Sequence, residues 1–325
     1  MNTKFYETSI NKRITPILFA LTLVAGAICF IVGDLALPLC VATLGALLLF
    51  DNTKFKAFSI LASALIIVAN VFGITFGLTF SVFGPSAVTI AFIIYLGYLH
   101  KQSKSDTALL STIFCGAFGL VSYILLAMML QGSYSMDAVK EFYTDIADYI
   151  RNTFVGMMSE AYAASGMQIE SELLLELIDM QFYMIISYLF IQAFILVGLS
   201  FKLFGFIVRK CSTDKEQIAS WRFEASSLYA YFYAILTFAI LFVNSFDNFY
   251  SVAAYNLYNI FMVIFAYIGY KAIILLLTKR FGPVISNLML IAALVVFSSF
   301  AAQLLAVVGV IYTIRKNKEA KLNSV

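Results

Sequence analysis

Apolar residues occur along this chain in long runs that short polar stretches separate. A helix needs about 20 apolar residues to cross a hydrocarbon core about 30 Å thick. Six runs approach or exceed this length, at residues 57–80, 82–99, 108–131, 180–206, 225–244 and 252–277. The pattern therefore predicts an all-α protein, a polytopic bundle of transmembrane helices.

Two further apolar stretches, one near each end of the chain, are longer. Residues 14–50 are interrupted at Gly33-Asp34, and residues 281–313 are interrupted more weakly at Ser298-Ser299. At about 1.5 Å of rise per residue, each stretch is too long for one upright span, and half of it is somewhat short. A short hairpin, a re-entrant segment and a single crossing all stay open.

Composition excludes a soluble globular protein. Of the 325 residues, 62% are hydrophobic and 12% are charged, whereas soluble chains have about 45–50% and about 25%. One compact core cannot bury that much apolar surface, but a bilayer can. We predict a single integral membrane domain over residues 1–325, in contact with the lipid bilayer. The net charge of +3 leaves no basic surface for nucleic acid.

Basic residues are concentrated in six clusters, and only Lys140 and Arg151 lie outside them. The clusters are Lys4, Lys12 and Arg13; Lys54 and Lys56; Lys101 and Lys104; Lys202, Arg209, Lys210, Lys215 and Arg222; Lys271, Lys279 and Arg280; and Arg315, Lys316, Lys318 and Lys321. If all six are cytoplasmic, the positive-inside rule holds and an even number of crossings separates them. This pattern predicts eight to ten spans with both termini in the cytoplasm.

Residues 132–179 form the only long polar segment, and it is strongly acidic. Apolar side chains recur there at intervals of three and four, at Val139, Phe142, Ile146, Ile150 and Phe154. This spacing predicts an amphipathic helix, and the acidic charge predicts an extracytoplasmic loop. The loop could be a solvated cap that packs on the spans, or a lid that attracts cations to a central cavity.

Polar side chains within the apolar runs are the candidate binding groups, because burying them in hydrocarbon is costly. Asn256 and Asn259 share one helix face, Tyr255 and Tyr258 adjoin them, and Gln192 is a single amide within another run. Two amides on one face can bind a polar solute or hydrogen-bond a neighbouring helix. We expect substrate binding or a helix contact at these five residues.

Other polar positions have simpler interpretations. Asp34 is the lone acid between two short apolar segments, where a turn accounts for it, and Asn70 is a single amide that suits a helix contact. The tripeptides at 83–85 and 281–283 are both Phe-Gly-Pro, and each begins an apolar run with proline near the first helical turn.

Motifs for catalysis, metal binding or cofactor binding are absent from the sequence. The four cysteines have no C-x-x-C spacing, and His100 is the single histidine. Nucleotide-binding loops, nucleophile elbows and paired catalytic carboxylates are also absent. We therefore expect no cofactor, no metal site and no enzymatic activity.

The C-terminal part carries a family resemblance. Trp221-Arg222-Phe223 follows a basic loop, Asn256 and Asn259 open a span that contains Gly269, and Gly309 to Thr313 precede Arg315-Lys316. This pattern, over about residues 170–316, resembles the YybS-like family of bacterial multispanning inner-membrane proteins, a domain of unknown function. The resemblance implies a multi-pass protein of a prokaryotic cytoplasmic membrane. It also implies distant kinship with the substrate-binding S components of energy-coupling-factor transporters.

Two functions fit these features. The first is a small-solute transporter, or the membrane-embedded substrate-binding component of one. A cytoplasmic ATPase or another membrane subunit would then contact Arg209, Lys210, Trp221 and Arg222. The alternative is a non-transporting scaffold or assembly protein of the cell envelope.

Overall fold

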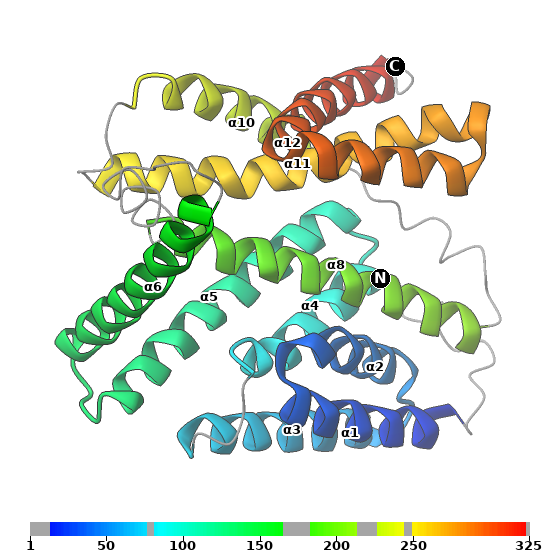
Figure 1. Cartoon of the computed structure of the whole chain (residues 1–325). Coiled ribbons are helices and arrows are strands. Elements are labelled where there is room, and N and C mark those ends of the chain that lie inside the picture. Colours follow the sequence, from blue (N-terminus) through cyan, green and yellow to red (C-terminus); the bar gives the residue numbers. More distant parts are fainter. Residues whose placement is uncertain (1–13, 77–80, 165–182, 213–225, 244–248, 323–325) are drawn as a thin grey trace. The chain divides into compact units, whose positions relative to one another are not determined.

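The computed structural model describes residues 14–76, 81–164, 183–212, 226–243 and 249–322. Every regular element in these ranges is a helix, which confirms the predicted all-α class (Figure 1). Each of the six predicted runs contains a helix. Five described segments are long and apolar enough to cross a membrane: Ile14–Phe50, Lys54–Gly73, Lys104–Leu130, Ile185–Cys211 and Tyr250–Phe281.

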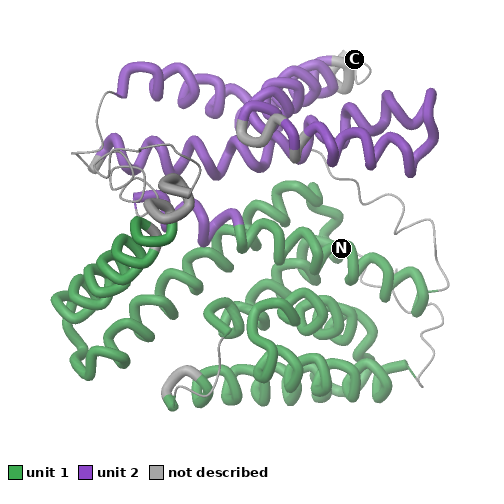
Figure 2. The backbone as a smooth tube through the Cα atoms, in the orientation of Figure 1, with its two compact units in different colours: residues 1–175, 192–223 green, residues 176–191, 224–325 purple. Residues whose placement is uncertain are grey.

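The chain divides into two compact units, and each is described by itself (Figure 2). Unit 1 comprises residues 1–175 and 192–223, and unit 2 comprises residues 176–191 and 224–325. Helix α8 (Ile185–Cys211) therefore contributes its first residues to unit 2 and the rest to unit 1.

Unit 1 is built around two short, buried helices, α2 (Leu37–Phe50) and α4 (Ala87–Leu99). Besides part of α8, it also contains α1 (Ile14–Val32), η2 (Gly33–Ala36), η3 (Lys54–Lys56), α3 (Ala57–Thr75), η4 (Gly84–Ser86), α5 (Lys104–Leu130) and α6 (Met136–Ala164). Helix α2 packs against α1 and α4, and α4 packs against α5. Most residues of α2 are buried, and Gly45 lets the Phe204 ring of α8 approach its backbone. This apolar helix is therefore the centre of unit 1.

The first apolar stretch forms two helices joined by a 3-10 turn. Gly33 begins the turn with a φ of +79°, a left-handed conformation that suits glycine. Pro38 follows in the first turn of α2, where a missing N–H costs little. Helix α4 also begins at a 3-10 turn with a proline, because η4 with Pro85 precedes it. Both α2 and α4 are thus short helices that begin next to a 3-10 turn and a proline.

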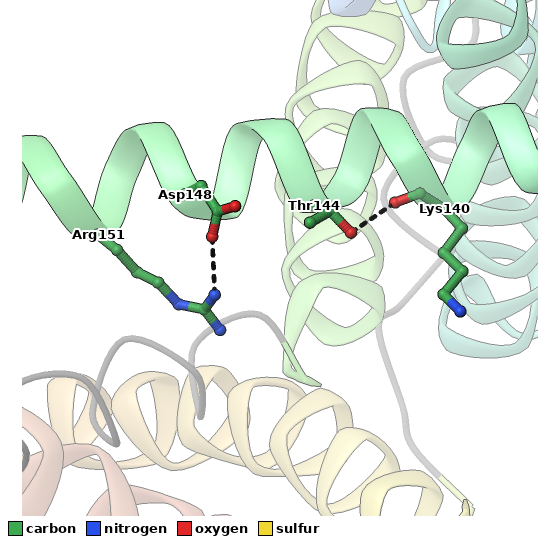
Figure 3. A network of polar contacts seen from close by, with 4 residues as sticks. All are labelled: Lys140, Thr144, Asp148 and Arg151. Atoms are coloured by element: carbon green, nitrogen blue, oxygen red, sulfur yellow. Dashed lines mark hydrogen bonds and ion pairs between the residues drawn. The ribbon is translucent and has the colours of Figure 1, made fainter.

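Helix α6 covers the first part of the acidic segment, whereas residues 165–179 of that segment lie outside the described residues. Ala138 and Ala147 are buried, and the Phe142 ring lies 6.1 Å from the Tyr123 ring of α5, centroid to centroid. The opposite face is polar. There Arg151 forms an ion pair with Asp148 at 3.0 Å, one turn from Thr144, whose hydroxyl donates to the Lys140 carbonyl at 2.9 Å (Figure 3). The amphipathic helix is thus present, and its apolar face packs partly on α5.

Unit 2 contains the start of α8, α10 (Ser227–Ile240), α11 (Phe249–Phe281) and α12 (Pro283–Leu322). Helices α11 and α12 pack along each other and are joined at Gly282, whose φ is +77° (Figure 1). At Gly269 and Gly309 the two helices approach so closely that an added Cβ would overlap the facing backbone carbonyls of Leu305 and Phe265. Residues 283–313 lie in one helix, so the hairpin considered for the last apolar stretch is not observed.

Candidate functional site

Asn256 of α11 is hydrogen-bonded to the start of α8. Its Oδ1 accepts from the backbone N–H of Ser187 at 2.7 Å, and its Nδ2 donates to the carbonyls of Tyr183 at 2.7 Å and Val252 at 2.9 Å. Ser187 lies in the first turn of α8, where backbone N–H groups have no partner within the helix. The buried amide therefore acts as a cap supplied by another helix.

Asn259 and the two tyrosines lie on α11 near this contact. Asn259 Nδ2 donates to the Met184 sulfur at 2.9 Å. Both amides therefore contact residues 183–187, at the start of α8. The Tyr258 ring stacks on Tyr233 of α10, with centroids 5.7 Å apart. Tyr255 is half-buried. The structure thus brings Asn256 and Asn259 together at a helix contact and Tyr258 into an aromatic cluster.

The other predicted site residues belong to unit 1 or lie outside the described residues. Gln192 is exposed and belongs to unit 1, whereas Asn256 and Asn259 belong to unit 2. A shared site of these three residues therefore stays a prediction. Arg209 and Lys210 are exposed at the end of α8, where Arg209 Nε donates to the Gly205 carbonyl at 3.2 Å. Trp221 and Arg222 lie outside the described residues.

A second polar group lies in unit 1, between the turn that precedes α2 and the segment that precedes α4. Asp34 of η2 accepts three hydrogen bonds from residues just before η4: from the Ser81 hydroxyl at 2.8 Å and from the backbone N–H groups of Phe83 at 2.9 Å and Val82 at 3.1 Å. A carboxylate at this position satisfies N–H groups that precede a helix and interacts favourably with the helix dipole. Asp34 therefore links the α1–α2 turn to the start of α4.

Asn70 of α3 completes this group. Its Nδ2 donates to the Ile66 carbonyl at 2.8 Å, whereas its Oδ1 has no hydrogen-bond partner within the part of the chain that the structure describes. Asn70 and Ser81 are each 2% exposed. A Cβ built on Gly84 would collide with Asn70 Oδ1 and with Ser81 Oγ, so both oxygens face that glycine. We call Asp34, Asn70, Ser81 and Gly84 the Asp34 cluster.

Sequence reasoning named three parts of this cluster but did not join them. Asp34 was assigned to a turn, Asn70 to a helix contact, and the tripeptide at 83–85 to a helix start. The available signal was the occurrence of glycine and proline interruptions in two neighbouring apolar stretches, because such interruptions often mark sites in membrane proteins.

A third polar group surrounds Asp51, between α2 and α3. Its carboxylate accepts from Thr53 N–H at 3.0 Å and hydroxyl at 2.6 Å, and from Ser59 N–H and hydroxyl at 2.8 Å each. Burial alone would raise the pKa of Asp51, but these hydrogen bonds stabilise the charged form and hold the pKa below its ordinary value. Four donors to one carboxylate make this group a structural connection between the two helices.

The apolar helices define the class as a helical membrane protein. Among the described residues, no three His, Cys, Asp or Glu side chains are grouped closely enough to hold a metal ion. Comparison with protein-family models, curated proteins and solved structures finds no match. The resemblance to the YybS-like family therefore stays a prediction.

Proposed function

We propose that this protein is a small-solute transporter or the membrane-embedded substrate-binding component of one. The observation that carries the proposal is Asp34, an acid inside an apolar stretch, which joins the turn before α2 to the segment before α4. An ionisable side chain within an apolar stretch of a membrane protein is a candidate functional group. Interrupted helices at a central polar group are typical of transporter binding sites.

The Asp34 cluster supplies hydrogen-bonding groups of different chemistry at one place. It offers a carboxylate, a hydroxyl and a carboxamide oxygen, all on helices or turns that pack around α2 and α4. In this proposal these groups contribute to the binding of a small polar solute. Asn256 and Asn259 have a different role in this proposal: they fix the start of α8 through the contacts with Ser187 and Met184.

The charge pattern supports a topology for such a component. The acidic helix α6 would lie on the extracytoplasmic face, and the basic clusters and both termini would be cytoplasmic, with an even number of crossings. The YybS-like resemblance favours the cytoplasmic membrane of a prokaryote. A cytoplasmic ATPase or another membrane subunit would bind the basic loop after α8, through exposed Arg209 and Lys210 together with Trp221 and Arg222.

The scaffold function is favoured by a different observation. Asn256 uses both atoms of its amide in contacts with backbone groups, and α6 exposes acidic side chains that could bind a partner. A scaffold would need no solute site, so a search for bound solute separates the two functions.

Native mass spectrometry of the full chain in lipid nanodiscs tests the proposal. We expect a non-lipid small molecule on the wild-type protein and on the control variant Asp106→Asn, which changes an exposed acid of α5. Asp34→Asn should lose that molecule. A co-purifying ATPase would support transport. Absence of any solute, together with a stable complex containing envelope assembly proteins, would contradict it.

A further inference from the structure

We infer that the Asp34 cluster binds one sodium ion. The inference rests on the proposed function, because it names an ion for the same site. It begins with the ligand atoms, which are all oxygens: the Asp34 carboxylate, the Ser81 hydroxyl and the Asn70 Oδ1. Hard cations prefer carboxylate, hydroxyl and amide carbonyl oxygens over nitrogen or sulfur.

Asn70 provides the observation that points to a ligand. It is 2% exposed, and its Oδ1 lacks a hydrogen-bond partner among the described residues. The bond from Nδ2 to the Ile66 carbonyl fixes the orientation of the amide, so the oxygen side is turned toward Gly84 and Ser81. A buried acceptor without a donor is unfavourable, and a cation satisfies it as well as a donor would.

Ser81 connects Asn70 to Asp34. Its Oγ faces Gly84 as Asn70 Oδ1 does, and it donates to Asp34 Oδ1 at 2.8 Å. The same oxygen also lies 3.9 Å from Cys29 Sγ. A hydroxyl oxygen is a ligand type that hard cations accept. The hydrogen bonds from Ser81, Val82 and Phe83 occupy three of about four lone-pair positions on the Asp34 carboxylate, which leaves one position for a cation.

The charge of the cluster selects a monovalent ion. Asp34 is the only acid of the cluster, so one positive charge makes this group neutral, as suits side chains that are almost fully buried. A divalent ion would leave the group with a net positive charge. Asn70 Oδ1 and Ser81 Oγ both lie against Gly84, and two oxygens held this close together suit the smaller sodium ion better than potassium.

Binding of radioactive sodium to the purified full chain in nanodiscs tests this inference, with choline chloride holding the ionic strength constant. We expect saturable binding of one ion per chain. Asp34→Asn and Asn70→Leu should each weaken it at least about tenfold, as loss of a metal-binding group does. Asp106→Asn should bind as the wild type does, because this acid is exposed at the start of α5.

Asn70→Leu separates ion binding from a purely structural role. Leucine keeps the branching at Cγ but has no oxygen, so loss of sodium binding in a folded variant identifies the Asn70 oxygen as a ligand. The unfolding temperature of each variant, measured in choline chloride, shows whether the variant has folded. If Asn70→Leu has not folded, Ser81→Ala takes its place as the test of the same site. The inference would be overturned if the wild type bound no sodium, or if folded Asn70→Leu bound sodium as tightly as the wild type. It would also be overturned if the site bound a proton and no sodium.

The two proposals fail in different ways. If a solute binds through Asp34 but sodium does not bind, the sodium inference is wrong and the transporter function stands. If sodium binds as expected but no solute binds or is transported, the transporter function is wrong and the sodium site stands.

Discussion

Asn70 and Asn256 are both buried carboxamides in apolar helices, but their hydrogen bonds differ. Asn256 makes three bonds to backbone groups, whereas the Oδ1 of Asn70 has no partner among the described residues. The sequence identified both as polar positions within hydrocarbon. It could not distinguish them, because the partners Tyr183 and Ser187 lie far from Asn256 in the chain.

Asn256→Ala should destabilise the protein by about 1–4 kcal/mol, because it leaves Ser187 N–H and the Tyr183 carbonyl without their partner. Thermal unfolding in detergent measures the effect. Asn259→Ala is the matched control and should cost less, since it removes a bond to a weak sulfur acceptor. Equal loss of stability in both variants would contradict the capping role of Asn256.

Asp51 gives a prediction in pH. Its pKa in the folded protein lies below the ordinary value of 3.8, so the charged carboxylate stabilises the fold above that pH and loses this effect as pH falls through the folded pKa. The difference in unfolding temperature between wild type and Asp51→Asn should therefore be constant near neutral pH and shrink below about pH 4. A difference that does not change with pH would contradict the hydrogen-bonded anion.

At the scale of helices, the two long apolar stretches behave differently for local reasons. Gly33, with a left-handed φ, and Pro38 end one helix and begin another in residues 14–50. Ser298-Ser299 does not interrupt α12, because serine is far less unfavourable in a helix than glycine or proline. Glycine and proline were thus reliable signals of a break, and serine was not.

Gly269 tests the close packing of α11 and α12. Gly269→Ala should cost at least about 2 kcal/mol, because its Cβ would overlap the Leu305 carbonyl and push the helices apart. Gly198→Ala in α8 is the matched control: an added Cβ there meets no atom within 4 Å, so the change should be neutral or slightly stabilising. Equal unfolding temperatures for the two variants would contradict the glycine contact.

For the whole molecule, composition and periodicity predicted the all-α class and the membrane environment, because both depend on the sum of many residues. The Asp34 cluster could not be predicted in the same way. It depends on contacts between Asp34 and residues 81–83, almost 50 positions away, and a pattern of single polar residues does not reveal such pairings.

Topology is a further prediction at this scale. A membrane-impermeant maleimide should label Asp148→Cys on α6 in intact cells and should not label Lys316→Cys, because the acidic segment would be outside and the basic C-terminal cluster inside. Lys316 lies in α12, which is one continuous helix, so labelling at this position reports on which side of the membrane α12 ends. Labelling of both cysteines would place the C-terminus outside and favour nine crossings.

Solute transport is the central claim, and untargeted measurement of the small molecules that cells accumulate tests it most directly. Cells expressing wild type or Asp106→Asn should accumulate at least one solute that cells expressing Asp34→Asn at equal membrane abundance do not, because Asp34 is the acid within the interrupted helices. Identical solute content in all three strains and in cells without the protein would contradict the account.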